Sequence, residues 1–370
     1  KMKRLVLFGG TFDPIHNAHL RIARFASDKL NATVMFLPAK HPRWKAPHAS
    51  IADRYEMIRL ALKDEKCPSL ILSDYEIKRR DKINYTINTI KHFRKVYPNS
   101  KLYLLIGADQ VSSFDRWQDA LNIAKLCQII YVDRPDIKIE QKNVKRYKMR
   151  SLEYNKSGVA SSHSIRHLAG LDTTPSVIKY IEEHHLYYIK TLEKEYYEPK
   201  RFHHALSVAN LAYMIAIKNH LKEPDLYYLA GILHDIGKKT SPKDSLKIME
   251  KYFKEYINDV PVKLYHQFVG AYLAKEKLGV NRKEIIDAIM YHASGRDNMS
   301  NIEKVVYASD KIDPTRGFDS SKLIRACVNN IKKGFIVVLK ANKDYLKKNN
   351  LSYNNSLTKK CFKFYLKKEE

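Results

Sequence analysis

The amino-acid sequence predicts an α/β domain with a parallel sheet over residues 1–190, followed by an all-α domain over residues 191–370. In the first half, short apolar or β-branched runs alternate with helix-like stretches, which is typical of a parallel sheet covered by helices. From Arg201 onward, apolar residues recur at helical spacing and no strand-like run stands out. A chain of 370 residues is also longer than one hydrophobic core usually organises.

The predicted strands are short apolar runs, each separated from the next by a helix-like segment. They cover residues 5–8, 33–37, 70–72, 102–106 and 128–132. The charged segment 191–200, which carries Pro199, is predicted to be a linker or a helix start. Helices are then predicted over residues 205–217, 227–233, 285–291 and 305–312. The Lys- and Asn-rich tail beyond Phe318 keeps apolar positions and is predicted to form a closing pair of helices.

The net charge of +27 at pH 7 indicates affinity for anions. Lysine, asparagine, isoleucine and tyrosine are abundant and only 12 residues are glycine, a bias that AT-rich coding also produces. No motif typical of RNA or DNA binding accompanies the charge. We therefore expect phosphate-bearing small molecules as partners, and not nucleic acid.

Other features of composition point to a cytoplasmic protein. No stretch of about eighteen uncharged apolar residues is present, so neither a membrane-spanning helix nor a membrane partner is expected. The first apolar run breaks at Gly9, which predicts a buried strand and not a signal peptide. The four cysteines lie far apart and without a Cys-x-x-Cys pair, which indicates reduced thiols. They are Cys67, Cys127, Cys327 and Cys361.

A glycine turn directly after the first predicted strand carries the chemistry of the first half. It reads Gly9-Gly10-Thr11-Phe12-Asp13-Pro14-Ile15-His16-Asn17-Ala18-His19. Glycines after a strand let a phosphate approach the backbone, and the following helix start offers N–H groups. Histidines three apart share one helix face and can stabilise charge that builds on an α-phosphoryl group. A zinc pair or a structural pair of histidines is the alternative, and the complete run after a strand disfavours it.

This loop resembles that of the bacterial nicotinate-mononucleotide adenylyltransferases, within the HxGH-type nucleotidylyltransferase superfamily. Further motifs of that family follow in order over about 185 residues. They are Pro38-x-x-x-Pro42 with Trp44-Lys45, Asn84-Tyr85-Thr86, Ile106-Gly107-Ala108-Asp109, Trp117, Ser161-Ser162-His163-Ser164-Ile165-Arg166, and Val177-x-x-Tyr180-Ile181 with Leu186-Tyr187. His163 stands where threonine is usual, and Asn84 where serine is usual. The resemblance implies a Rossmann-like nucleotidylyltransferase fold.

The resemblance also implies roles for these residues. The phosphate of nicotinate mononucleotide would attack the α-phosphorus of ATP, giving deamido-NAD and pyrophosphate, with Mg²⁺ on the phosphates. The residues stabilising negative charge would be His16, His19, Lys45 and Arg166. ATP would contact Gly9, Gly10, Thr11, Phe12, His16, His19, Gly107, Asp109, Ser162 and Arg166, and the nicotinate nucleotide would contact Thr86 and Trp117. Nicotinamide mononucleotide or another acceptor, such as phosphopantetheine, is the alternative.

The second half carries histidines and aspartates that could hold metal ions. They are His204, His234, Asp235, His266, His292 and Asp310. Imidazoles and carboxylates suit iron, manganese or zinc, and the two oxygens of Asp235 could bridge two ions. A pair of ions can polarise a phosphoryl oxygen. Ordinary core or surface histidines are the alternative in a chain with 15 of them, but the run His234-Asp235-Ile236-Gly237-Lys238 favours metal binding.

Over residues 196–335 the sequence resembles the HD-domain phosphohydrolases, and within them the YqeK-type proteins, di-iron hydrolases that cut diadenosine tetraphosphate into two ADP. The matching elements are Arg201-x-x-His204, His234-Asp235-Ile236-Gly237-Lys238, His266-x-x-x-Gly270-Ala271, His292-x-x-Gly295 and Ser309-Asp310-Lys311-Ile312-Asp313-Pro314-x-Arg316. Departures from the pattern are Ala293, Ser294 and Ser309.

This second resemblance implies two ion positions, with iron in both. One ion would take His204, His234, Asp235 and Asp310, and the other Asp235, His266 and His292. Lys238 would contact substrate phosphate, and Arg201 or Arg316 would help unless they are solvated helix-end charges. A general nucleotidase, a cyclic-nucleotide phosphodiesterase and a regulatory module without turnover are the alternatives.

For the whole chain we predict a bifunctional cytoplasmic enzyme with two independent sites. Its predicted substrates are ATP, nicotinate mononucleotide and diadenosine tetraphosphate. The sequence is compatible with a homo-oligomer but does not define the oligomeric state. A nucleotide-sensing scaffold, in which the second half regulates the first, is the non-enzymatic alternative.

Overall fold

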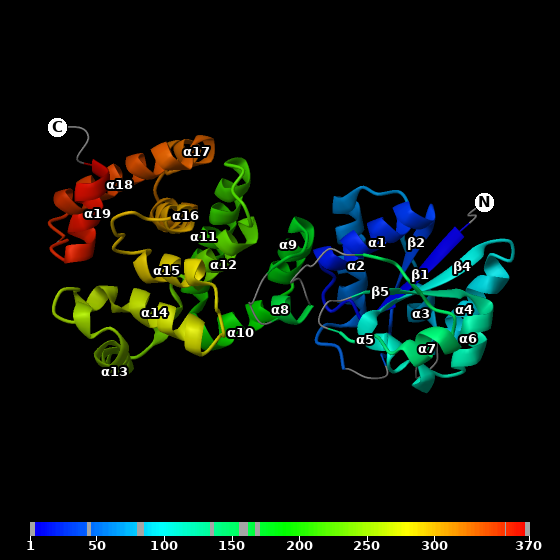
Figure 1. Cartoon of the computed structure of the whole chain (residues 1–370). Coiled ribbons are helices and arrows are strands. Elements are labelled where there is room, and N and C mark those ends of the chain that lie inside the picture. Colours follow the sequence, from blue (N-terminus) through cyan, green and yellow to red (C-terminus); the bar gives the residue numbers. More distant parts are fainter. Residues whose placement is uncertain are drawn as a thin grey trace. The chain divides into compact units, whose positions relative to one another are not determined.

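The computed structural model describes residues 4–42, 46–79, 85–133, 137–154, 162–166, 171–351 and 353–366, without the side chains of His163 and Ser164. The chain divides into two compact units (Figure 1). The first consists of Lys1–Arg166 and Asp172–Tyr187, and the second of His167–Leu171 and Tyr188–Glu370. The division at Tyr187 lies three residues before the predicted boundary at residue 190.

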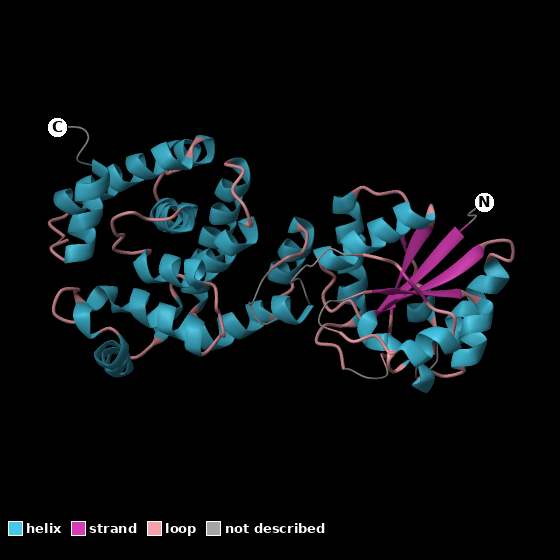
Figure 2. Cartoon of the chain, viewed as in Figure 1, coloured by secondary structure: helices cyan, strands magenta, loops and turns pink. Residues whose placement is uncertain are grey.

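Among the described residues, the first unit contains a six-stranded parallel sheet of order β3-β2-β1-β4-β5-β6. The strands are β1 (Arg4–Gly10), β2 (Thr33–Pro38), β3 (Leu70–Leu72), β4 (Lys101–Gly107), β5 (Gln128–Val132) and β6 (Arg150–Ser151). The second unit is helical wherever it is described, as the colours of Figure 2 show. The predicted fold class, α/β followed by all-α, is therefore confirmed.

The strand β1 lies in the middle of this sheet, where its residues are buried and where the strand order reverses. Leu5, Val6 and Leu7 in β1 are at most 1% exposed, because helices cover the sheet on both faces. The strand order reverses between β1 and β4, and ligands of open parallel sheets bind beyond the carboxyl ends of the strands at such a point. Gly9 and Gly10 are the last two residues of β1 there, and the predicted Gly107–Asp109 element begins at the last residue of β4.

Helices lie between the strands of the first unit, and two more, α8 (Ser162–Arg166) and α9 (Pro175–Glu183), follow its last strand. Those between the strands are α1 (Asn17–Leu30), α2 (Ile51–Glu65), α3 (Tyr75–Lys78), α4 (Thr86–Val96), α5 (Ala108–Val111), the 3₁₀ turn Phe114–Arg116, α6 (Ala120–Leu126) and α7 (Gln141–Arg146). One core cluster joins β1, β2, β4 and β5 to α4 and α6, with Phe114 fully buried in it. This packing fixes the ends of β1, β4 and α4 relative to one another.

The second unit begins with α10 (Tyr188–Thr191) and a π-helical turn, Leu192–Tyr196. Pro199 is then the first residue of α11 (Pro199–Lys218). A backbone N–H at this position has no partner within the helix, so its absence in proline costs no hydrogen bond. The helices that follow are α12 (Pro224–Leu233), α13 (Pro242–Tyr252), α14 (Tyr265–Glu276), α15 (Lys283–Tyr291), α16 (Asn301–Ile312), α17 (Ser321–Asn329), α18 (Ile331–Lys348) and α19 (Ser356–Leu366), with the 3₁₀ turn Ile236–Lys239 after α12.

The prediction of a closing pair of helices is wrong, since three helices follow Phe318 within the described residues. Asn330 is extended, with φ −161°, and its side chain caps α18, so that α17 and α18 are separate helices. The helix α19 then follows α18. In the part of the chain that the structure describes, no helix is long and apolar enough to cross a bilayer.

Candidate functional sites

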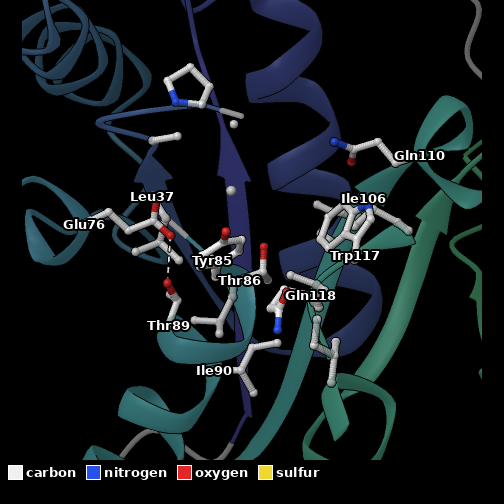
Figure 3. Close-up of a pocket in the computed structure, with 18 of the residues that line it drawn as sticks. Leu37, Glu76, Tyr85, Thr86, Thr89, Ile90, Ile106, Gln110, Trp117 and Gln118 are labelled. Atoms are coloured by element: carbon white, nitrogen blue, oxygen red, sulfur yellow. Dashed lines mark hydrogen bonds between the residues drawn. The ribbon is translucent and has the colours of Figure 1, made fainter. Parts of the chain in front are cut away.

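A pocket of about 510 Å³ lies at the carboxyl ends of β1 and β4 (Figure 3). Six of the predicted nucleotide-contacting residues line it together: Gly9, Gly10, Thr11, Thr86, Asp109 and Trp117. Thr86 is the first residue of α4, and Trp117 follows the 3₁₀ turn after α5. The pocket therefore joins the glycine turn to the element predicted to contact the acceptor.

The two glycines of the turn have different roles. A Cβ added at Gly9 would meet no atom within 4 Å, so this position leaves open space at the pocket wall. A Cβ at Gly10 would lie 2.9 Å from the ring of Phe12, which must pack there. Phe12 was predicted to contact ATP. The residue is 3% exposed, and the centroid of its ring lies 5.4 Å from that of Phe8. Gly9 is thus the position that suits close approach of a ligand.

His16 and His19 meet at the start of α1 and do not line the pocket. Their rings stack with centroids 3.7 Å apart, and the His16 backbone N–H donates to His19 Nδ1 at 3.4 Å. Since His19 Nδ1 accepts, the proton of a neutral ring sits on Nε2, which is then a donor. The His19 ring also contacts Phe12 at 5.0 Å, so the pair lies beside the glycine turn.

Asp13 is a buried carboxylate that sequence reasoning missed. It is 5% exposed and accepts hydrogen bonds from the backbone N–H groups of His48 (2.8 Å) and Ala49 (3.1 Å) and from the Tyr187 hydroxyl (2.8 Å). Burial raises the pKa of Asp13, but these hydrogen bonds outweigh it, so the pKa lies below its ordinary value. An acidic residue inside a loop built for phosphates was the available signal, since its charge needs donors of its own.

Two predicted phosphate contacts hold the same loop. The Arg166 guanidinium donates to the Asp13 carbonyl oxygen, and the Ser162 hydroxyl donates to that of Pro14 at 2.8 Å. Arg166 is 8% exposed, and within the described structure its Nε has no hydrogen-bond partner. A donor left over in a buried guanidinium suits an anionic ligand.

The remaining predictions for this site differ in outcome. Gly107 precedes α5, where a Cβ would lie 2.4 Å from the Asp109 carboxylate, so it makes room for that side chain. Lys45 and Asn84 lie outside the described residues. The pocket also contains Glu76, which was not predicted; it accepts a hydrogen bond from the Thr89 hydroxyl at 2.8 Å, and burial raises its pKa.

In the second unit, five elements bring the six predicted metal ligands together. His204 lies in α11, His266 in α14 and Asp310 in α16, while His234 and His292 directly follow the last residues of α12 and α15. Asp235 follows His234 directly, and all six residues are at most 9% exposed. The ligand atoms fall into two groups, His204–His234–Asp235 and Asp235–His266–His292, each within 4.8 Å. Asp310 joins the first group, since its Oδ1 lies 3.2 Å from His204 Nε2.

Asp235 lies between the two groups. Its Oδ1 is 3.4 Å from His266 Nε2 and 3.5 Å from His292 Nε2, and its Oδ2 is 3.6 Å from His234 Nε2. Gly237 allows this approach, because a Cβ there would lie 2.3 Å from the His266 carbonyl oxygen. The position of Asp235 is that of a carboxylate able to bridge two ions.

The imidazoles are oriented as metal ligands. His234, His266 and His292 each direct Nδ1 to a backbone carbonyl three residues earlier, at 2.6, 2.9 and 2.7 Å. Such a bond holds the proton on Nδ1 and leaves the lone pair of Nε2 for a ligand. His234 Nε2 is buried and, within the described structure, has no hydrogen-bond partner. Burial lowers the pKa values of His266 and His292, which favours the neutral rings that metal binding needs. The donor set therefore fits two divalent ions.

A pocket of about 720 Å³ opens onto His204. Its basic lining residues are Lys200, Arg201, His203, His204, Lys238, Lys239 and Arg316. Arg201 pairs with Asp235 at 2.9 Å and Arg316 with Asp310 at 2.5 Å, and their side chains are still 44% and 38% exposed. Cations that border a metal-ligand cluster and also face a pocket suit phosphates.

The fold and these sites define a two-domain protein of nucleotide chemistry: an α/β nucleotidyltransferase-type domain followed by an HD-type helical domain. Residues 7–168 match the Cytidylyltransferase-like family, and residues 201–315 match the HD domain family.

Two relatives whose names give both activities match nearly the whole chain. A Mycoplasma genitalium protein named "Probable nicotinate-nucleotide adenylyltransferase/Ap4A hydrolase" is 33% identical over 347 residues, covering 91% of this chain and 97% of the relative. Its namesake in Mycoplasma pneumoniae is 31% identical over 350 residues, covering 90% and 98%. A Coxiella burnetii "Probable nicotinate-nucleotide adenylyltransferase" is 41% identical over 140 residues, covering 37% of this chain and 64% of the relative. The chain belongs to the family of the two mycoplasma proteins, and both resemblances predicted from the sequence are confirmed.

Proposed function

We propose that the first unit transfers AMP from ATP to nicotinate mononucleotide, giving deamido-NAD and pyrophosphate. The observation that carries this proposal is the pocket at the β1/β4 switch point, which combines an open glycine position with Thr86 and Trp117. The names of the relatives support the same activity.

The proposed chemistry needs positioning and charge stabilisation, without a covalent enzyme intermediate. The phosphate of the mononucleotide attacks the α-phosphorus of ATP, and pyrophosphate leaves. His16 and His19, which lie beside the glycine turn, would donate to the reacting phosphates, with the Nε2 proton of His19 as a donor. Arg166 would offer its Nε, which has no hydrogen-bond partner among the described residues. Lys45 adds a further cation, and Mg²⁺ arrives with the nucleotide phosphates.

The preference for nicotinate rests on charge. Thr86 opens α4, and the N-terminus of a helix favours a carboxylate over a neutral amide. Trp117 is half-buried and packs against Phe114, with ring centroids 4.9 Å apart. Its indole therefore offers a fixed aromatic surface to a pyridine ring. Turnover of nicotinate mononucleotide, nicotinamide mononucleotide and phosphopantetheine by the full chain tests this assignment. Equal rates with the first two would overturn it.

For the second unit we propose a metal-dependent phosphohydrolase that cuts diadenosine tetraphosphate symmetrically into two ADP. The observation that carries it is the buried His234 Nε2, which has no hydrogen-bond partner in the described part of the chain and lies among the other predicted ligands, beside a basic pocket. We propose two iron ions, one on His204, His234, Asp235 and Asp310 and the other on Asp235, His266 and His292. When bound, the ions supply Lewis acidity that polarises the phosphoryl group under attack.

The residues that would bind the substrate line the pocket beside the ligands. Lys238, Arg201 and Arg316 would hold the polyphosphate, and the arginines are exposed enough to turn from their carboxylates towards it. A long row of phosphates fits a basic pocket of this size better than a single phosphate ester does.

Metal analysis of the purified chain, with identification of the products from diadenosine tetraphosphate, tests the proposal. ADP as the sole product and about two iron ions per chain are expected. ATP and AMP as products would exclude symmetrical cleavage, and faster hydrolysis of mononucleotides would favour a general nucleotidase. His234→Ala should abolish hydrolysis and leave adenylyl transfer unchanged; loss of both activities would mean that the sites are coupled.

A further inference from the structure

The four histidines of the metal-ligand cluster are not held alike. Three of them direct Nδ1 to a backbone carbonyl, as described above. His204 Nδ1 instead lies 2.8 Å from Oδ2 of Asp313, a carboxylate that is 0% exposed. The Thr315 hydroxyl donates to the same Oδ2. A carboxylate behind an imidazole makes the ring a more basic ligand than a carbonyl does, and fixes its orientation.

The two ligand groups also differ in their carboxylates. The group around His204 includes Asp310 and one oxygen of Asp235, whereas the group of His266 and His292 has only the other oxygen of Asp235. Affinity for divalent ions rises with the number of charged ligands. The first group thus has four ligand residues and the second has three, with Asp235 common to both.

Nearby cations could cancel this difference, so their positions matter. Lys311 bonds Oδ2 of Asp310 at 2.7 Å, which leaves Oδ1 to face His204 and His234. Arg316 pairs with that Oδ1 and also donates to the Asp310 carbonyl oxygen, and Arg201 pairs with Oδ2 of Asp235 at 2.9 Å. Both arginine side chains line the open pocket and are 38% and 44% exposed, so their guanidinium groups can turn from the carboxylates when ions bind. Asp313 lies behind His204, out of contact with solvent, where its charge is screened least.

We propose that Asp313 is a positioning residue that makes the two ion positions unequal: it orients and strengthens His204, so that the His204–His234–Asp235–Asp310 position binds its ion more tightly and fills first. The position formed by Asp235, His266 and His292 then holds a weaker, exchangeable ion. This inference rests on the proposed two-ion site.

Titration of the metal-free full-length protein with Mn²⁺ tests this, with the electron paramagnetic resonance signal of free Mn²⁺ as the readout. We expect two classes of binding whose dissociation constants differ by about 10–100-fold, the factor that such outer partners contribute. A signal from two neighbouring Mn²⁺ ions should appear only as the second class fills. His292→Gln should remove the weak class alone, which assigns the classes to the two positions.

Asp313→Asn is the decisive variant, since asparagine keeps the volume and removes the charge. It should weaken the tight class by about 10–100-fold and leave the weak class unchanged. The matched control is Asp344→Asn on the exposed face of α18, which should bind both ions as the wild type does. If Asp313→Asn does not fold, Thr315→Val provides the second test, because it removes only the hydroxyl that orients Asp313 and should weaken the same class by a smaller factor.

The outcomes separate this inference from the function on which it rests. Two equal classes in the wild type would overturn the role of Asp313. So would an unchanged tight class in Asp313→Asn, or loss of the weak class alone in that variant. A wild-type protein that binds no Mn²⁺ would instead overturn the proposed metal site.

Discussion

Replacing Asp13 by asparagine is the sharpest test of how the phosphate loop is held. Oδ1 of Asp13 accepts from the Ala49 N–H and from the Tyr187 hydroxyl, and Oδ2 accepts from the His48 N–H. An asparagine side chain has one acceptor oxygen, and its NH₂ group would face donors on the other side. The change therefore removes hydrogen bonds and a charge with almost no change in volume.

The cost follows from the number and kind of these contacts. A hydrogen bond to a charged group contributes about 1.5–3 kcal/mol, and the substitution removes those made on one oxygen. Arg166 Nη1 lies 4.0 Å from Asp13 Oδ2 with both side chains buried, and Arg54, which is 1% exposed, lies in the field of Asp13. The variant therefore also removes the anion that faces these buried cations. We expect a loss of about 3–5 kcal/mol in the free energy of unfolding of the first unit, as for other broken buried charge pairs.

The effect should depend on pH with a definite sign. The pKa of Asp13 in the folded protein lies below its ordinary value, because its hydrogen bonds outweigh burial. The stability that the carboxylate contributes is therefore complete above the unfolded pKa of about 3.9, and it is lost as the pH falls through the lower folded pKa. The difference between wild type and Asp13→Asn should stay constant near neutral pH and shrink below about pH 4.

The assay can follow the first unit alone. Both tryptophans, Trp44 and Trp117, belong to it, so urea denaturation monitored by tryptophan fluorescence reports its unfolding within the intact chain. Asp64→Asn, on the helix α2 and bonded to Ser176, serves as a control for a less buried carboxylate and should cost less. Equal stability of variant and wild type at pH 7, or a difference that does not shrink on acidification, would refute the account of Asp13.

Three further substitutions test the two sites. His16→Ala should lower kcat for adenylyl transfer by about 10²–10³-fold, as for lost charge-stabilising donors, and leave hydrolysis of diadenosine tetraphosphate intact; a kcat within twofold of wild type would speak against the role of His16. Trp117→Ala should raise KM for nicotinate mononucleotide by roughly tenfold or more and leave KM for ATP nearly unchanged, and a larger effect on ATP would reassign the residue. Gly237→Ala puts a Cβ 2.3 Å from the His266 carbonyl oxygen, so bound metal per chain should fall and the second unit should lose about 1–3 kcal/mol; normal metal content would show that the loop adapts.

The sheet was predictable because strands buried on both faces need continuous apolar runs. Five strands gave such runs, whereas β6 is only two residues, Arg150–Ser151, too short to show any period. Two closing helices were predicted where the described chain has three, because nothing in the sequence marks Asn330 as the residue that separates α17 from α18. That separation depends on the Asn330 side chain, which caps the start of α18.

The site residues also fall into two groups, those that could be predicted from the sequence and those that could not. Residues that must meet a nucleotide or a metal are constrained in type and spacing, and the sequence therefore pointed to Thr86, Trp117 and the HD ligands. Residues that hold those groups depend on partners far along the chain. Tyr187 bonds Asp13 over 174 residues, and His204 bonds Asp313 over 109, so no local pattern predicts either contact.

The two buried carboxylate clusters differ in a way that separates a structural hub from an ion site. Asp13 faces N–H and O–H donors, so its oxygens are satisfied by the protein itself. Asp235 Oδ1 faces the Nε2 atoms of His266 and His292, whose protons are held on Nδ1. Three hydrogen-bond acceptors therefore lie together there without a proton between them. Such an arrangement costs free energy in a protein interior unless a cation joins the acceptors. The folding of the second unit should therefore depend on its metal ions, whereas the phosphate loop of the first unit is already held in place before a nucleotide binds.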